Sequence, residues 1–156
     1  MLFKILVKRP ENRSLPSHTP ADKPTILFAD DEFVVRVSVG TILRREGFDV
    51  LDAVDGADAL SQLVTRGAPV DLLLTDIRMP QMDGIELARR VCKIYPATPV
   101  LYISAYPFSL ERQEPERLLG HCTFLEKPFR RKALLDAVRK CLASAEHMGR
   151  VRLMGA

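Results

Sequence analysis

The sequence has few cysteines and no long apolar run. Its three cysteines, Cys92, Cys122 and Cys141, follow neither a CxxC nor a metal-ligand spacing, and each lies within an apolar pattern. This predicts buried free thiols in a reducing compartment. The first seven residues are too short for a signal peptide, and no apolar run reaches the length of a membrane span. The chain is therefore expected to be cytoplasmic, without a membrane as partner.

Net charge of either sign is also scarce, because the formal value for the whole chain is only +3. Residues 1–24 carry +3 and residues 144–156 carry +1, which leaves residues 25–143 at −1. A nucleic-acid-binding domain usually presents a basic face on its folded part. Direct binding of nucleic acid is therefore not expected.

The composition, with 47% hydrophobic and 28% charged residues, is typical of a soluble globular protein. Residues 8–24 hold four prolines and almost nothing apolar, so residues 1–24 are predicted to form a basic, Pro-rich arm or linker. One folded domain is predicted over residues 25–145. Residues 146–156 are predicted to be a tail and are too few to form an output domain.

From residue 25 onward, short apolar runs alternate with segments of helical spacing. The predicted strands are Thr25–Ala29, Phe48–Ala53, Val70–Thr75, Pro99–Ile103 and Cys122–Glu126. The predicted helices are Phe33–Glu46, Asp55–Arg66, Gly84–Tyr95, Phe108–Leu119 and Arg130–Ala145, the fourth being weakened by Pro115. Five such alternations with short connections predict an α/β fold. It is a flavodoxin-like (βα)5 doubly wound parallel sheet with the strand order 2-1-3-4-5.

Carboxylates stand at the ends of two of these predicted strands. Asp30 and Asp31 follow the first strand, and Asp76 follows the third. In the predicted order the first and third strands lie on either side of the point where the strand order reverses. The three carboxylates at their ends should therefore converge. Carboxylates at close range repel one another and favour a cation, and oxygen ligands without His or Cys favour Mg²⁺. The sequence therefore predicts a magnesium site there.

Two further polar groups follow the remaining strands, Ser104 after the fourth and Lys127 after the fifth. A metal, a hydroxyl and an ammonium around a carboxylate suit a phosphoryl group, and Asp76 as acceptor would form an acyl phosphate. Each pattern alone also has a structural explanation. The Asp pair can cap a helix, with Asp31 as the cap, and Lys-Pro can form a turn. Their joint occurrence at four strand ends favours the functional interpretation.

Four motifs occur in order along residues 25–143: FADDE (Phe28–Glu32), LLLTDIRMPQMDG (Leu72–Gly84), ISA (Ile103–Ala105) and FLEKPF (Phe124–Phe129). In these motifs the chain resembles the receiver domain of two-component response regulators. The resemblance implies that Asp76 takes a phosphoryl group from a histidine kinase or a histidine phosphotransfer protein in a Mg²⁺-dependent reaction. The module would then change conformation to control a downstream partner. It would be no enzyme beyond assisting its own phosphorylation and dephosphorylation.

The resemblance also implies how the metal is held. Asp31 would bind Mg²⁺ directly, and Asp30 would do so mainly through water. Asp76 itself and the backbone carbonyl of Arg78 would complete the protein ligands.

The resemblance further implies how the phosphoryl group is sensed. Lys127, in a cis peptide with Pro128, would contact the phosphoryl oxygens. Ser104 would move to hydrogen-bond the phosphate, and Phe124 would change rotamer in response. The output face would combine the fourth helix, fifth strand and fifth helix and could also form a homodimer. The segment Pro107–Gly120 departs from the family pattern.

Other functions are compatible with parts of this pattern. A metal-dependent phosphohydrolase with an Asp nucleophile would need a second catalytic carboxylate two residues after that nucleophile. This chain has Arg78 at that position, which counts against the alternative. A degenerate receiver that acts only by binding is disfavoured, because every site position is filled. A DNA-binding regulator is disfavoured because no output domain follows.

Overall fold

The computed structural model describes residues 23–105 and 122–154 of the chain. Its elements in chain order are β1 (Thr25–Ala29), α1 (Phe33–Arg45), β2 (Asp49–Ala53), α2 (Gly56–Arg66), β3 (Leu72–Asp76), α3 (Gly84–Ile94), β4 (Val100–Ser104), β5 (Cys122–Glu126) and α5 (Arg131–Met154). None of the described helices combines the length and the apolar character that crossing a bilayer requires.

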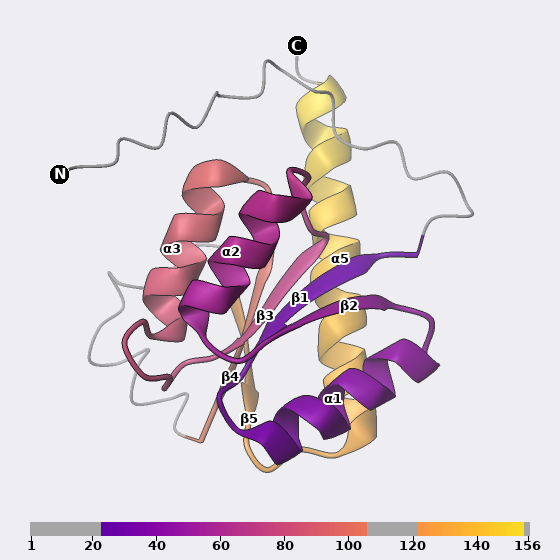
Figure 1. Ribbon diagram of the computed structural model, residues 1–156. Coiled ribbons are helices and arrows are strands. Elements are labelled where there is room, and N and C mark those ends of the chain that lie inside the picture. Colours follow the sequence, from indigo (N-terminus) through magenta and orange to yellow (C-terminus); the bar gives the residue numbers. More distant parts are fainter. Residues whose placement is uncertain (1–22, 106–121, 155–156) are drawn as a thin grey trace, which may run out of the picture.

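The strands form one parallel sheet with the order β2-β1-β3-β4-β5 (Figure 1). This confirms the predicted doubly wound fold and its strand order. Every residue of β1, β3 and β4 is buried, because helices cover the sheet on both faces. A strand buried on both faces has a nearly continuous apolar sequence rather than an alternating one, as these three strands do.

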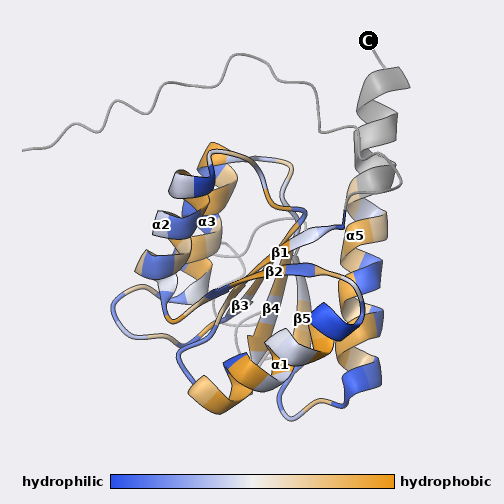
Figure 2. Cartoon of the chain, turned by 45° about the vertical axis from the view of Figure 1, so that its right-hand side comes forward, coloured by the Kyte–Doolittle hydropathy of each residue, from blue (hydrophilic) through white to orange (hydrophobic). Residues whose placement is uncertain are grey.

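The core is divided by the sheet into two apolar layers, because successive side chains of a strand point to opposite faces. In β1, Leu27 and Ala29 face α2 and α3, whereas Ile26 and Phe28 face α1 and α5. Figure 2 shows the strands between helices whose outer surfaces are largely hydrophilic, apart from the start of α1. The two layers hold the sheet in place, and with it the ends of its strands.

Strand register brings the carboxyl ends of four strands into one row. Ala29 of β1 pairs with Thr75 of β3, and Asp76 pairs with Ile103 of β4. At the end of the row, Ser104 pairs with Glu126 of β5. The residues that end or follow these strands therefore share one edge of the sheet, which is where parallel α/β sheets bind ligands.

The helix α5 is longer than predicted. We expected it to end at Ala145, but it continues to Met154. The prediction was wrong because it relied on the loss of a regular apolar pattern. Residues 146–154 contain no proline and consist mainly of good helix formers, so the backbone can remain helical. The domain boundaries themselves remain predictions.

The start of α1 also differs from the prediction. Asp31 was expected to cap this helix, but the N-cap residue is Glu32, which makes no side-chain capping hydrogen bond. The Asp30 carboxylate accepts a hydrogen bond from the Glu32 backbone N–H at 2.8 Å instead. Asp31 therefore has no capping role that would hold its carboxylate at the helix end.

Several predictions lie partly or wholly outside the described residues. They include nearly all of the N-terminal arm at residues 1–24 and the predicted fourth helix Phe108–Leu119. The thiol predictions can be examined at two positions. Cys141 is buried and Cys92 is half-buried, and both are free thiols, as predicted.

Candidate functional site

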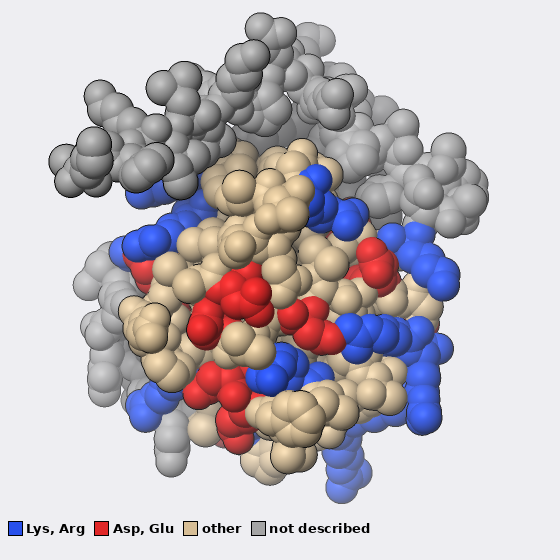
Figure 3. Space-filling view, in the orientation of Figure 1, with Lys and Arg blue, Asp and Glu red and all other residues tan. Residues whose placement is uncertain are grey.

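Three carboxylates converge at the shared edge of the sheet. Asp30, Asp31 and Asp76 each place an oxygen within 4.8 Å of the other two. Asp30 is completely buried and Asp76 is 6% exposed, whereas Asp31 is open to solvent. In the view of Figure 3, acidic side chains gather across the middle of the surface and basic side chains lie mostly around its margin. The arrangement provides buried and accessible oxygen donors for a cation.

Asp76 is held by backbone contacts around the start of α3. The Thr75 hydroxyl donates to the Asp76 carbonyl at 2.9 Å, and the Gly84 N–H donates to the Ile77 carbonyl at 2.9 Å. A Cβ atom at position 84 would lie only 2.1 Å from the Asp76 carbonyl oxygen. Glycine is therefore required where α3 begins, because the helix starts directly against the backbone of Asp76.

The loop between β1 and α1 is fixed by contacts with α1. Arg36 donates from its guanidinium to the Asp30 carbonyl at 2.7 Å. The central carbon of the Arg36 guanidinium lies 5.7 Å from the centre of the Phe33 ring, within the range of a cation–π contact. These contacts, together with the bond from the Glu32 N–H to the Asp30 carboxylate, hold the loop that carries Asp30 and Asp31.

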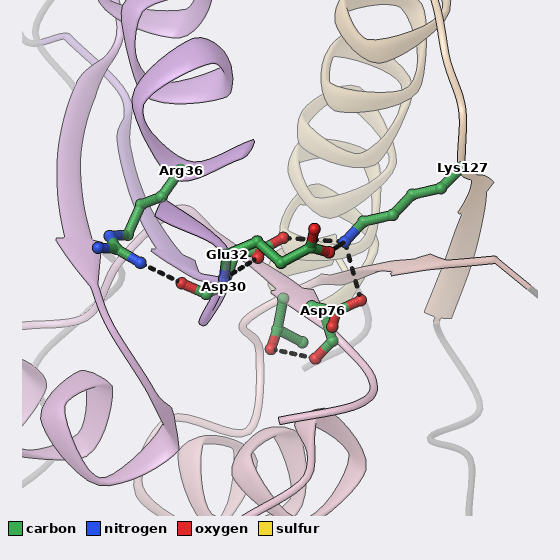
Figure 4. A network of polar contacts seen from close by, with 6 residues as sticks. Asp30, Glu32, Arg36, Asp76 and Lys127 are labelled. Carbon is green, nitrogen blue, oxygen red and sulfur yellow. Dashed lines mark hydrogen bonds and ion pairs between the residues drawn. The ribbon is translucent and has the colours of Figure 1, made fainter. Parts of the chain in front are cut away.

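Lys127 extends from the end of β5 into the carboxylate cluster (Figure 4). Its ammonium nitrogen lies 3.1 Å from a Glu32 oxygen, 3.2 Å from an Asp30 oxygen and 3.4 Å from an Asp76 oxygen. The Lys127 backbone N–H donates to the Ser104 carbonyl at 2.9 Å, which ties the lysine to the end of β4. The peptide bond before Pro128 is cis, as predicted.

Burial and the neighbouring charges shift the ionisation of this cluster. Burial raises the pKa of Asp76 to about 6, against the opposing attraction of Lys127 and with added repulsion from Asp30. Burial also raises the pKa of Asp30. For Lys127, burial lowers the pKa, but attraction to Glu32, Asp30 and Asp76 outweighs burial and the pKa is raised overall. The lysine is therefore cationic at neutral pH, and burial makes the charged forms of Asp30 and Asp76 unfavourable.

Of the other predicted site residues, Ser104 and Arg78 lie at or near the same edge, whereas Phe124 lies in the middle of β5. Ser104 is buried at the end of β4. Arg78 is exposed, two residues after Asp76. Phe124 is half-buried, and its ring stacks on Tyr102 with the ring centres 5.4 Å apart. Phe124 thus belongs to the core layer facing α2 and α3 as well as to the strand that leads to Lys127.

The donor set fits Mg²⁺. Asp30, Asp31 and Asp76 supply hard carboxylate oxygens, and no histidine or thiol belongs to this cluster of described residues. Only Asp31 of the three is exposed, so it can bind a hydrated ion without first being uncovered. Burial raises the pKa values of Asp30 and Asp76, so the charged form of each carboxylate is unfavourable in the metal-free site. A bound dication would stabilise these charged forms.

Two contacts of the site were missed at the level of sequence. Glu32 reaches Lys127 across 95 positions of the chain, and Arg36 reaches back to the Asp30 carbonyl. Both are charged residues at the start of α1, one on each side of the apolar residues 33–35, and a solvated side chain is the ordinary expectation for such positions. The only available signal was their nearness in sequence to the aspartate pair.

Comparison with known proteins assigns the family. Over residues 26–139 the chain matches the family of the response regulator receiver domain. The chain therefore belongs to the receiver domains of two-component response regulators. The phosphohydrolase alternative is not favoured by this assignment.

Individual relatives agree with the family. The chain is 35% identical over 117 residues to sporulation initiation phosphotransferase F of Bacillus subtilis, covering 75% of this chain and 92% of that protein. It is 35% identical over 118 residues to chemotaxis protein CheY of Treponema pallidum, covering 75% and 81%. Among solved structures, a response regulator receiver protein from Sinorhizobium medicae is 32% identical. It covers 80% of this chain and 98% of its own, with a TM-score of 0.70.

Proposed function

We propose that Asp76 is the phosphoacceptor of this receiver domain and takes its phosphoryl group from a phosphohistidine. The observation that carries the proposal is the position of Asp76, which is buried at a strand end with Lys127 and two further carboxylates around it. A carboxylate oxygen of Asp76 attacks phosphorus, and the new P–O bond forms as the P–N bond of the phosphohistidine breaks. The imidazole nitrogen keeps the electron pair of that bond and takes up a proton.

The carboxylate form of Asp76 is the nucleophile in this step. Since the pKa of Asp76 is raised to about 6, the side chain is largely ionised at neutral pH, even before a metal binds. Burial removes much of the hydration that would otherwise have to be displaced, because only 9% of the side chain is exposed. The Thr75 and Gly84 contacts hold the Asp76 backbone while the side chain reacts.

Mg²⁺ is the proposed cofactor. Asp31 and Asp76 would bind it directly, Asp30 mainly through water, and Arg78 through its backbone carbonyl. When bound, the ion supplies charge neutralisation for the carboxylates and for the phosphoryl oxygens.

Two side chains of the protein would act on the phosphoryl group itself. Lys127 already lies against the Asp30, Asp31 and Asp76 cluster, the site called the crevice below, and it is cationic. It would therefore contact the phosphoryl oxygens as a charged donor. Ser104 would donate a hydroxyl hydrogen bond from the end of β4. Phe124 would respond by changing its rotamer. It lies in β5, the strand that leads to Lys127, and its ring packs on Tyr102.

The proposed phosphodonor is a histidine kinase or a histidine phosphotransfer protein, and it must cover the mouth of the crevice to place its histidine near Asp76. The first turns of α1 border this mouth and carry unusually exposed apolar side chains. Phe33, Val34 and Val37 are 68%, 74% and 50% exposed. Figure 2 shows this start of α1 as hydrophobic. Exposed apolar groups gathered in one place are typical of a protein contact surface.

The output of the module is a change of its surface on phosphorylation. Phosphorylation would alter the output face, which consists of the predicted fourth helix, β5 and α5, and this change would control a downstream protein or form a homodimer. A cytoplasmic location and the absence of any enzyme activity beyond self-phosphorylation and self-dephosphorylation complete the proposal.

A direct experiment tests the assignment. The protein is incubated with Mg²⁺ and acetyl phosphate, and its intact mass is measured. Asp76 is expected to gain one phosphoryl group as acetate leaves, and the Asp76→Asn variant is expected to gain none. The same gain in the variant would refute Asp76 as the acceptor.

A further inference from the structure

Lys127 is paired with one carboxylate that lies outside the metal cluster. The cluster consists of Asp30, Asp31 and Asp76, whereas Glu32 belongs to none of its ligand positions. Nevertheless, Glu32 makes the shortest of the three ion pairs that join Lys127 to other described residues, at 3.1 Å. In Figure 4 the Glu32 carboxylate meets the lysine ammonium from the side of α1, opposite the backbone of β5.

Hydrogen bonds to two carboxylates of the described residues use two of the donors of the Lys127 ammonium. A lysine ammonium has three N–H donors. Glu32 and Asp30 accept hydrogen bonds from it at 3.1 and 3.2 Å, and Asp76 lies in ion-pair range at 3.4 Å. A phosphoryl oxygen that needs more than one of these donors must displace a carboxylate. The closest contacts of the ammonium are thus with the loop before α1, and its longest contact is with Asp76.

Glu32 is the partner that leaves at least cost. Asp30 is fully buried, so losing its lysine contact would leave a buried charge with weaker compensation. The Glu32 side chain is 61% exposed and can return to water. Because the Glu32 carboxylate is exposed, its ion pair with Lys127 is partly solvated and therefore weak.

We propose that Glu32 is a positioning residue that competes with the phosphoryl group for the Lys127 ammonium and so weakens the hold of the crevice on that group. The inference rests on the proposed function, because it assumes that the crevice binds a phosphoryl group at Asp76. Glu32 thereby sets how readily the unphosphorylated and phosphorylated states interconvert. Removing the competition makes the lysine available to the phosphoryl oxygens.

The test uses beryllium fluoride, a non-covalent phosphoryl analogue, titrated into the full chain at saturating Mg²⁺ and followed by calorimetry. Glu32→Gln keeps the length of the side chain and removes its charge. We expect the analogue to bind about 2- to 5-fold more tightly, as for the loss of a partly solvated ion pair. Glu32→Asp keeps the charge but withdraws it from Lys127, and we expect the affinity to rise here too.

Mg²⁺ titration without the analogue supplies a second, independent readout. Glu32→Gln removes a negative charge near the metal ligands and frees the ammonium to approach Asp76. Both effects weaken Mg²⁺ binding, so the two affinities should move in opposite directions. A general disruption of the loop would weaken both. Glu46→Gln is the matched control, because it removes an ion-paired glutamate from the other end of α1, and it should leave both affinities unchanged.

The outcomes separate the inference from the function on which it rests. If Glu32→Gln binds the analogue no more tightly than the unmodified chain, the inference is wrong while the proposed function stands. The inference is also wrong if Glu32→Gln binds more tightly but Glu32→Asp does not, because charge alone would then explain the effect. If the unmodified chain with Mg²⁺ does not bind the analogue, both the proposed function and the inference are overturned.

Discussion

Replacing the carboxylate of Asp76, the proposed phosphoacceptor, should make the metal-free protein more stable. The Asp76→Asn substitution keeps the shape of the side chain and removes a charge that burial makes unfavourable. The pKa of Asp76 is raised from 3.8 to about 6. Each pKa unit corresponds to about 1.36 kcal/mol, so ionised Asp76 lowers the free energy of unfolding by about 3 kcal/mol at neutral pH.

The pH dependence follows from the direction of the shift. Because the folded-state pKa is raised, the unfolded chain releases the Asp76 proton first as the pH increases. The stability that comes from a protonated Asp76 is therefore fully present below pH 3.8. It is lost between pH 3.8 and about 6 and stays lost above that window. The advantage of Asp76→Asn should accordingly be about 3 kcal/mol at pH 7.5 and about half as large at pH 5.

Urea denaturation in the presence of a chelator measures this difference. For a chain of this size, about 3 kcal/mol also corresponds to an increase in Tm of roughly 6–12 °C. Asp136→Asn is the control, because Asp136 is an exposed carboxylate paired with Lys132 on α5, and it should change stability by less than about 0.5 kcal/mol. Equal or lower stability of Asp76→Asn at pH 7.5 would refute the reasoning about the buried charge.

Three further substitutions test separate parts of the site. Gly84→Ala should lower the free energy of unfolding by roughly 1–3 kcal/mol, because the added Cβ meets the Asp76 carbonyl oxygen at 2.1 Å; urea denaturation giving no loss would contradict that packing. Asp31→Ala should weaken Mg²⁺ binding at least about tenfold, measured by calorimetry, and an unchanged affinity would exclude Asp31 as a ligand. Lys127→Met should retain Mg²⁺ binding but lose most affinity for beryllium fluoride, and full retention of that affinity would show that the ammonium does not contact the phosphoryl group.

The fold could be predicted from sequence because its strongest signals are local. The runs that became β1 and β3 are apolar without alternation, which is what a strand covered on both faces requires. Short connections and regular alternation with helices then allow few arrangements other than a parallel doubly wound sheet. The element ends were less well predicted, as α5 shows, because no proline interrupts the helix after Ala145.

The candidate site was predictable in its location but not in its contacts. Asp30, Asp76 and Lys127 each adjoin the end of a strand, and the strand order alone brings those ends together. The contact between Glu32 and Lys127 depends on the direction of two long side chains across the crevice, which no local pattern specifies. The requirement for glycine at position 84 likewise follows from the distance between α3 and the Asp76 carbonyl, and only the folded structure provides that distance.

The central claim is that the phosphoryl group is bound covalently to the Asp76 carboxylate. Locating the modified residue tests this claim most directly. The protein is phosphorylated with phosphoramidate and Mg²⁺, and the acyl phosphate is reduced with borohydride, which converts a phosphorylated aspartate to homoserine. Peptide sequencing by mass spectrometry then identifies the position. Homoserine at position 76 alone is the expected result, whereas homoserine at position 30 or 31, or a phosphate retained on Ser104, would contradict the account.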